Sequence, residues 1–163
     1  MHTIYAPWRK EYFGSQESSC VFCAISSAPD SDTQNRVFYR DDFCFGVMNR
    51  FPYTPGHFML IPHAHCDSPE LLDSKTWAHI QNLSQKAFGI LYEYGASGIN
   101  MGMNVKKAGG AGIPEHIHIH FVPRYVGDTN FMTSVANART YGVDFDEVFE
   151  TISRLANKHL KER

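Results

Sequence analysis

The clearest pattern in the chain lies at residues 115–124, which read Glu115-His116-Ile117-His118-Ile119-His120-Phe121-Val122-Pro123-Arg124. Three histidines alternate with apolar residues at a period of two, which is the period of an extended strand. A strand places the three imidazoles on one face, whereas a helix would scatter them around its axis. The pattern therefore predicts a strand over 116–122 that holds a metal, performs acid–base or nucleophilic chemistry, or does both.

Short apolar runs bounded by turn residues predict the other strands of the sheet. They are expected at residues 36–39, 43–48, 57–61 and 99–104. The first two flank Arg40-Asp41-Asp42 and predict a hairpin. One long helix between strands favours an α+β domain with a mostly antiparallel sheet of about five strands.

Two helices are expected from apolar residues at near-helical spacing. The first runs from about residue 70 to 94, where Asp73 or Ser74 would cap it and Gly95 would end it. The second begins at about Asp144, after a segment at 126–141 that is expected to be irregular. The 163 residues suit a single domain with an N-terminal arm at 1–19 and a C-terminal tail and helix at 126–163.

Composition narrows the classes of function. The net charge is −2 and no long basic run is present, so neither nucleic acid nor an anionic membrane is an expected partner. No apolar segment approaches the roughly 20 residues that span a bilayer. Residues 1–10 lack an apolar signal core, so the four cysteines are expected to be reduced in a cytoplasmic protein.

The pair Cys20-Val21-Phe22-Cys23 has the spacing that lets two thiolates reach one tetrahedral zinc. Two further ligands are needed, and histidine is the usual partner. His116 heads the histidine strand and His65 follows another strand end, so we expect a Cys2His2 site from Cys20, Cys23, His65 and His116. At this stage His63 could replace His65, Cys66 is not excluded, and Cys44 is interpreted as a core thiol.

Catalysis is expected at the two remaining histidines of the strand. A neutral imidazole is a competent nucleophile toward phosphorus when one ring nitrogen is free and the other donates to a fixed acceptor. His118 is the expected nucleophile, with a backbone carbonyl in the loop before the strand as the acceptor. His120 would face the same ligand and hydrogen-bond a phosphoryl oxygen or the departing group.

A glycine-rich loop, Ala108-Gly109-Gly110-Ala111-Gly112, leads into the histidine strand. Glycines let backbone N–H groups approach an anion closely, although no P-loop pattern is present. Asn104, at the end of the preceding strand, could donate its amide hydrogen to a phosphate. The loop is therefore a candidate phosphate site.

These motifs resemble those of the histidine triad superfamily. Besides His-Ile-His-Ile-His, the run from Asn49 to Pro62 is similar to a second conserved region of that family, and Cys20-Val21-Phe22-Cys23 is similar to the zinc pair of many bacterial members. The resemblance covers roughly residues 5–132. It implies the family's α+β fold, which is commonly a homodimer, and an attack by His118 on the α-phosphorus of a nucleoside polyphosphate.

The resemblance also implies which residues bind the nucleotide. Asn49 would contact the ribose, and Asn104 with the backbone of Gly110, Ala111 and Gly112 would contact the phosphates. Apolar groups near Phe45, Val47 and Ile61 would receive the base, and Asp128 and Asn130 could shape a second nucleotide or phosphate pocket.

Finer details are similar to the diadenosine tetraphosphate phosphorylase branch of the superfamily. They are Ala6-Pro7-Trp8-Arg9, the Ala-Gly-Gly loop and the segment from Val122 to Met132. Fragile histidine triad hydrolases usually carry a glutamine where Gly110 stands, and the galactose-1-phosphate uridylyltransferase branch has a glutamine where His120 stands. We therefore expect a nucleotidyl transfer with phosphate as acceptor. A hydrolase of dinucleoside polyphosphates or nucleoside phosphoramidates, and a non-catalytic nucleotide sensor, are the alternatives.

Overall fold

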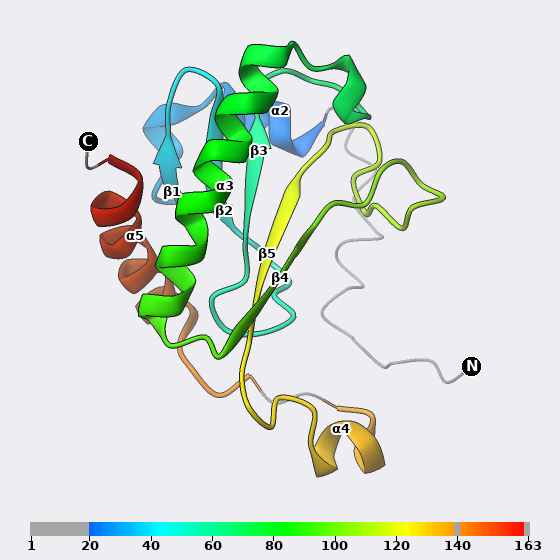
Figure 1. The fold of residues 1–163 in the computed structure, drawn as a ribbon, viewed down its shortest axis with the longest axis vertical. Coiled ribbons are helices and arrows are strands. Elements are labelled where there is room, and N and C mark those ends of the chain that lie inside the picture. Colours follow the sequence, from blue (N-terminus) through cyan, green and yellow to red (C-terminus); the bar gives the residue numbers. More distant parts are fainter. Residues whose placement is uncertain (1–19, 139–140, 162–163) are drawn as a thin grey trace.

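The computed structural model describes residues 20–138 and 141–161. The motif Ala6-Pro7-Trp8-Arg9 and the arm at 1–19 lie outside these residues. The strands form one antiparallel sheet in the order β1-β2-β3-β5-β4 (Figure 1). Their bounds are β1 Val37–Arg40, β2 Cys44–Met48, β3 Phe58–Pro62, β4 Gly98–Gly102 and β5 Ile119–Arg124. The expected α+β fold with five antiparallel strands is confirmed.

The helices also follow the sequence pattern closely. Their bounds are α2 Val21–Ser26, α3 Ser74–Tyr94, α4 Phe131–Ala136 and α5 Phe145–Lys161, with 3-10 turns at Pro29–Ser31 and Pro69–Leu71. Asp73 caps α3 by accepting the Thr76 N–H. Gly95 ends α3 with a φ of 110°, a left-handed conformation that favours glycine. The short helix α4 was not expected, because 126–141 was interpreted as irregular.

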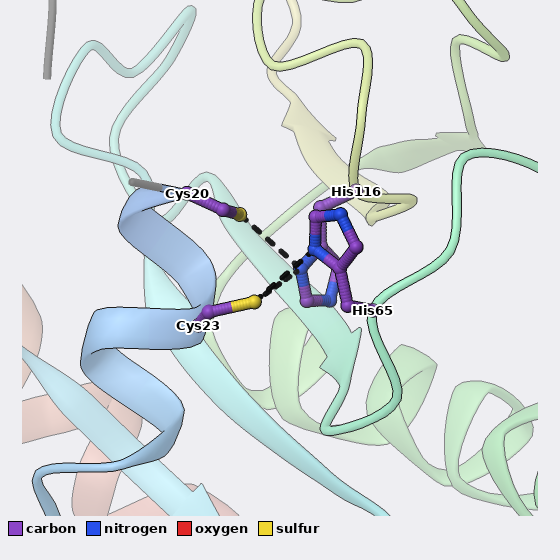
Figure 2. A group of neighbouring side chains, drawn as sticks. All are labelled: Cys20, Cys23, His65 and His116. Carbon is purple, nitrogen blue, oxygen red and sulfur yellow. Dashed lines mark hydrogen bonds between the residues drawn. The ribbon is translucent and has the colours of Figure 1, made fainter. Parts of the chain in front are cut away.

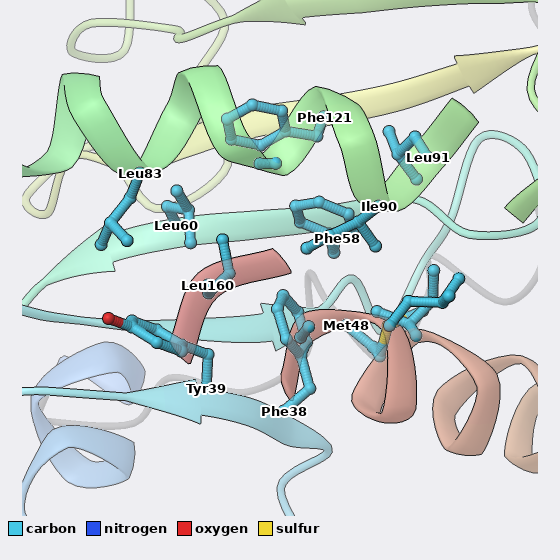
Figure 3. Close-up of a cluster of buried hydrophobic side chains, with 14 of the residues drawn as sticks. Phe38, Tyr39, Met48, Phe58, Leu60, Leu83, Ile90, Leu91, Phe121 and Leu160 are labelled. Carbon is cyan, nitrogen blue, oxygen red and sulfur yellow. The ribbon is translucent and has the colours of Figure 1, made fainter. Parts of the chain in front are cut away.

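The main hydrophobic core lies between one face of the sheet and the pair α3 and α5 (Figures 1 and 3). Alternate residues of β3 and β5, such as Phe58, Leu60 and Phe121, point into it and are fully buried. The same alternation sends Met59 and Ile61 to the opposite face, where they pack with Phe22 of α2. This second face is the one that carries the histidines, because Met59 of β3 lies directly opposite His120 of β5.

The histidine strand begins later than expected. The ladder starts at Ile119, so His116 and His118 precede it, although the segment was predicted to be a strand from 116. The Ile117 N–H donates to the Cys66 carbonyl, and the His116 ring turns toward the N-terminal cysteines. Around His116 and His118, these contacts take the place of regular pairing with β3. In the described part of the chain, no helix has the length and apolar character to cross a lipid bilayer.

Candidate active site and metal centre

The four expected metal ligands converge at the N-terminal end of α2 (Figure 2). Cys20 and Cys23 come from the start of α2, His65 follows β3, and His116 precedes β5. The Sγ atom of Cys23 lies 3.1 Å from Nδ1 of His65 and 3.6 Å from Nδ1 of His116. The Sγ atom of Cys20 lies 3.4 Å from Nδ1 of His116.

These separations fit a metal. A tetrahedral zinc with Zn–S of about 2.3 Å and Zn–N of about 2.0–2.1 Å separates its sulfur and nitrogen ligands by about 3.5 Å. His116 is also oriented for ligation, because its Nε2–H donates to the Pro62 carbonyl at 2.9 Å and leaves the Nδ1 lone pair toward the thiols. Burial, together with a hydrogen bond to Cys20, raises the pKa of the Cys23 thiol. The cluster therefore has the donor set and spacing of a zinc site.

The contacts of His63 bear on the alternative ligands that the sequence left open. Its Nδ1 accepts from the Ser26 hydroxyl at 2.7 Å, and its Nε2–H donates to the Asp41 carbonyl at 2.9 Å. With both nitrogens engaged, His63 lies outside the cluster, and so does Cys66. Cys44 is fully buried in the core, as expected.

His118 has the hydrogen bond expected of a nucleophile. Its Nδ1–H donates to the backbone carbonyl of His116 at 2.8 Å, which leaves the lone pair on Nε2. Among the described residues, none hydrogen-bonds Nε2 of His118. Every buried polar side-chain atom of the described residues has a hydrogen-bond partner, so a nitrogen without one is not buried, and solvent reaches Nε2 of His118. Burial lowers the pKa of His118, which keeps the ring neutral at pH 7. Ile117 and Ile119 are both buried and anchor the backbone on either side.

His120 lies beside His118, with ring centroids 4.9 Å apart. Its Nδ1 lies 3.0 Å from Nε2 of His57, a residue whose role the sequence analysis missed. The Tyr53 N–H donates to Nδ1 of His57 at 3.1 Å, so the proton of neutral His57 is on Nε2 and points at His120. Nδ1 of His120 therefore accepts, and its Nε2 carries the proton.

Burial accounts for the charge state of this histidine pair. His57 is completely buried, and burial lowers its pKa to about 3. Burial and the neighbouring His118 lower the pKa of His120 to about 4. Both rings are neutral at pH 7, so the Tyr53-His57-His120 chain delivers one N–H donor next to the free nitrogen of His118. One neutral acceptor beside one neutral donor suits attack on phosphorus.

The expected nucleotide-binding residues lie in two places. Asn49 is at the histidines, since its Nδ2 lies 3.2 Å from Nε2 of His57 and its Oδ1 accepts the Phe51 N–H. Because both of these nitrogens carry protons in the assigned tautomer, the 3.2 Å separation is a close approach of two donors and not a hydrogen bond. Asn104 instead donates weakly to the Gly110 carbonyl at 3.5 Å. Within the glycine loop, the N–H groups of Gly110 and Ala111 donate to loop carbonyls at residues 107 and 106. No hydrogen bond joins this loop to His118 or His120 in the described residues.

Residues 30–127 match the model of the HIT domain. The chain belongs to the HIT domain family. Among curated HIT relatives, an "AP-4-A phosphorylase" of Mycobacterium tuberculosis is 33% identical over 110 residues, which is 67% of this chain and 56% of that protein. A "Bis(5'-adenosyl)-triphosphatase" of Saccharomyces cerevisiae is 27% identical over 99 residues, or 57% of this chain and 48% of that protein. The chain thus spans about half the length of these two relatives.

A solved HIT structure also resembles the chain. It is a zinc-bound histidine triad family protein from Mycobacterium smegmatis, with a TM-score of 0.70 and 30% identity over 88% of this chain and 98% of that one. The HIT-like fold is thereby confirmed. The zinc named for that protein is consistent with the Cys2His2 cluster found in this chain.

Proposed function

We propose that the chain is a nucleotidyl-transferring enzyme that cleaves dinucleoside polyphosphates, in the manner of a diadenosine tetraphosphate phosphorylase. The observation that carries this proposal is the hydrogen bond from Nδ1–H of His118 to the His116 carbonyl, which leaves an accessible lone pair on Nε2. A neutral imidazole held in this tautomer can act as a nucleophile, and phosphorus is an electrophile that imidazole attacks readily.

The first step forms a bond between Nε2 of His118 and the α-phosphorus. The bond from that phosphorus to its bridging oxygen breaks, and a nucleoside polyphosphate leaves. The Nε2–H of His120 donates to a phosphoryl oxygen or to the departing oxygen, where negative charge develops. In the second step an oxygen of inorganic phosphate attacks the same phosphorus, the N–P bond breaks, and a nucleoside diphosphate leaves with His118 restored.

For substrate binding we propose the residues that the family resemblance implies. Asn49 would contact the ribose, and its contact with His57 supports a place beside the reacting phosphorus. Asn104 and the backbone of Gly110, Ala111 and Gly112 would contact the phosphates. Because Gly110 and Ala111 donate within the loop, this role requires the loop to rearrange when the anion binds.

Two further proposals concern the assembly. We propose a structural zinc at Cys20, Cys23, His65 and His116, supported by the ligand spacing. We also propose a homodimer of single-domain protomers spanning residues 1–163. Its support is the edge strand β4, which pairs on one side only within the described residues and has exposed residues from Asn100 to Gly102.

The acceptor is tested by product analysis. Diadenosine tetraphosphate with labelled inorganic phosphate should give labelled ADP and unlabelled ATP. A hydrolase is the second candidate, supported by the similarity to the yeast triphosphatase, and it would give AMP and ATP with no label in any nucleotide. An unchanged rate without phosphate would refute the phosphorylase. No turnover under any condition, with nucleotide still bound, would favour the sensor.

A further inference from the structure

The helix that carries the two cysteines also carries an aromatic ring to the catalytic histidine. Phe22 lies between Cys20 and Cys23 and is buried on the side of the sheet that bears the histidines. Its ring centroid lies 5.1 Å from that of His118, with the planes tilted by 58°. The same ring meets His116 edge-on at 5.6 Å. One turn of α2 therefore contacts both the metal ligand and the proposed nucleophile.

The hydrogen bond to the His116 carbonyl does not hold the His118 ring by itself. This bond selects the Nδ1–H tautomer only while the ring stays in place, and a single bond at Nδ1 leaves the ring free to tilt away from the carbonyl. His120 meets the ring edge-on at 4.9 Å, and Phe22 packs against it at 5.1 Å. Together these contacts define the ring plane and hence the direction of the Nε2 lone pair. Attack on phosphorus depends on that direction, because the nucleophile must approach in line with the leaving oxygen.

The position of Phe22 depends in turn on what holds α2. This helix has six residues, too few to be stable by itself, and no side chain caps its N-terminus. Arg40 fixes its C-terminal end by donating to the carbonyls of Ile25 and Ser26. Its N-terminal turn, which carries Phe22, is held by the cysteine–histidine cluster and by the packing of the Phe22 ring itself.

We infer that Phe22 is a positioning residue that orients His118 for attack, and that metal binding at Cys20 and Cys23 reaches the nucleophile through it. The inference rests on the proposed function, in which His118 forms the nucleotidyl-histidine. The metal site then has a second role besides stabilising the fold: it sets the alignment of the reacting nitrogen.

The test compares Phe22→Leu with Val37→Ala. Val37 belongs to the same apolar cluster, so its truncation also weakens packing, but it has no ring contact with a histidine. Both zinc-loaded proteins are mixed with diadenosine tetraphosphate without phosphate, and the acid-labile nucleotidyl-histidine is counted over a single turnover. We expect Phe22→Leu to slow its formation by about tenfold or more, with KM changed less than about twofold and Val37→Ala close to wild type.

A second measurement does not depend on turnover. Nitrogen-15 spectra of the imidazoles report which ring nitrogen of His118 carries the proton. In the zinc-loaded wild type we expect one Nδ1–H tautomer, and in Phe22→Leu, or after zinc is removed by a chelator, a mixture of tautomers. Phe22→Met serves in the same assays if Phe22→Leu does not fold, because it also removes the ring.

The outcomes are distinguishable. The positioning role is overturned if zinc-loaded Phe22→Leu forms the intermediate at the wild-type rate, if Val37→Ala slows it equally, or if metal removal leaves both rate and tautomer unchanged. If the wild type turns over substrate but forms no covalent intermediate, the proposed nucleophile is wrong and the role of Phe22 is refuted with it.

Discussion

Nε2 of His57 lies 3.0 Å from Nδ1 of His120, and this contact links the segment before β3 to strand β5 through their side chains. His57 immediately precedes β3, and His120 lies in β5. Because the Tyr53 N–H occupies the other nitrogen of His57, the contact has a direction: His57 donates and His120 accepts. The backbone of one loop thereby sets the proton position of a side chain at the proposed reaction centre.

The first prediction tests this relay. His57→Leu removes the donor to His120, so His120 no longer favours the tautomer with its proton on Nε2. We expect kcat to fall about ten- to a hundredfold. In His120→Ala, kcat should fall by a similar factor. In the double variant kcat should be scarcely lower than in either single variant, because both changes remove the same His57–His120 interaction. Steady-state kinetics on the three variants and the wild type give the coupling free energy between His57 and His120.

The control for this cycle is His79→Leu. His79 donates to the Asp41 carboxylate from α3, away from the reacting histidines. The His79→Leu variant should have a lower free energy of unfolding and an unchanged kcat. Fully additive effects of the His57 and His120 variants would contradict the relay.

The second prediction concerns acid stability. Burial lowers the pKa of His57 to about 3, while an unfolded histidine titrates near 6.5. Between these values the unfolded state binds more protons, so stability rises with pH, is fully present above about pH 6.5, and is lost as the pH falls toward 3. From pH 7 to pH 5, His57 alone should lower the free energy of unfolding by about 2 kcal/mol.

Urea unfolding at pH 7 and pH 5 measures this loss. In His57→Leu the drop between the two pH values should be smaller than in wild type by about that amount. An equal drop in both proteins would mean that His57 is already protonated in the fold or is exposed to water, contrary to its burial.

Much of this arrangement could be predicted from the sequence because it depends on local periodicity. The alternation of His116, His118 and His120 with isoleucines indicated one shared environment, and the Cys20–Cys23 spacing indicated half a metal site. The acceptor for His118 is a backbone carbonyl, as expected, but it belongs to His116, which the sequence pattern placed inside the strand and not in the loop before it. Long helices such as α3 were found because their apolar stripes persist over many turns.

What could not be predicted depends on pairing between strands. His57 was not singled out because its role follows from the β3–β5 register, in which Met59 lies opposite His120. A signal was present, since His57 and Met59 have the same parity and so share a face, but the sequence alone does not state which strands are neighbours. The helix α4 was missed because six residues are too few to show a periodic stripe.

The third prediction concerns the metal. Cys23→Ser and His65→Gln should each lower the zinc content from about one to about zero equivalents per chain, because a tetrahedral site loses a ligand. With free zinc at about a thousand times its Kd, loss of binding removes about 4 kcal/mol of stability. Elemental analysis and urea unfolding on the same samples test both effects.

Matched controls for the metal are His63→Gln and Cys66→Ser. Both residues lie near the cluster in sequence but outside it in space. Each variant should keep its zinc. Retention of zinc by Cys23→Ser, or its loss from His63→Gln, would assign the ligands differently.

The last prediction concerns the loop proposed to bind phosphate. A Cβ added at Gly109 would overlap the Val105 carbonyl oxygen, and that atom belongs to the backbone and cannot rotate away. Gly109→Ala must therefore displace the loop and with it the weak contact between Asn104 and Gly110. We expect KM for diadenosine tetraphosphate to rise roughly tenfold with a smaller change in kcat, since the histidines are untouched.

The control is Gly98→Ala, where the new Cβ would meet the nearest side chain at an ordinary 3.8 Å. Unchanged KM in Gly109→Ala, with the same loop shift visible in a crystal structure, would exclude the loop from substrate binding.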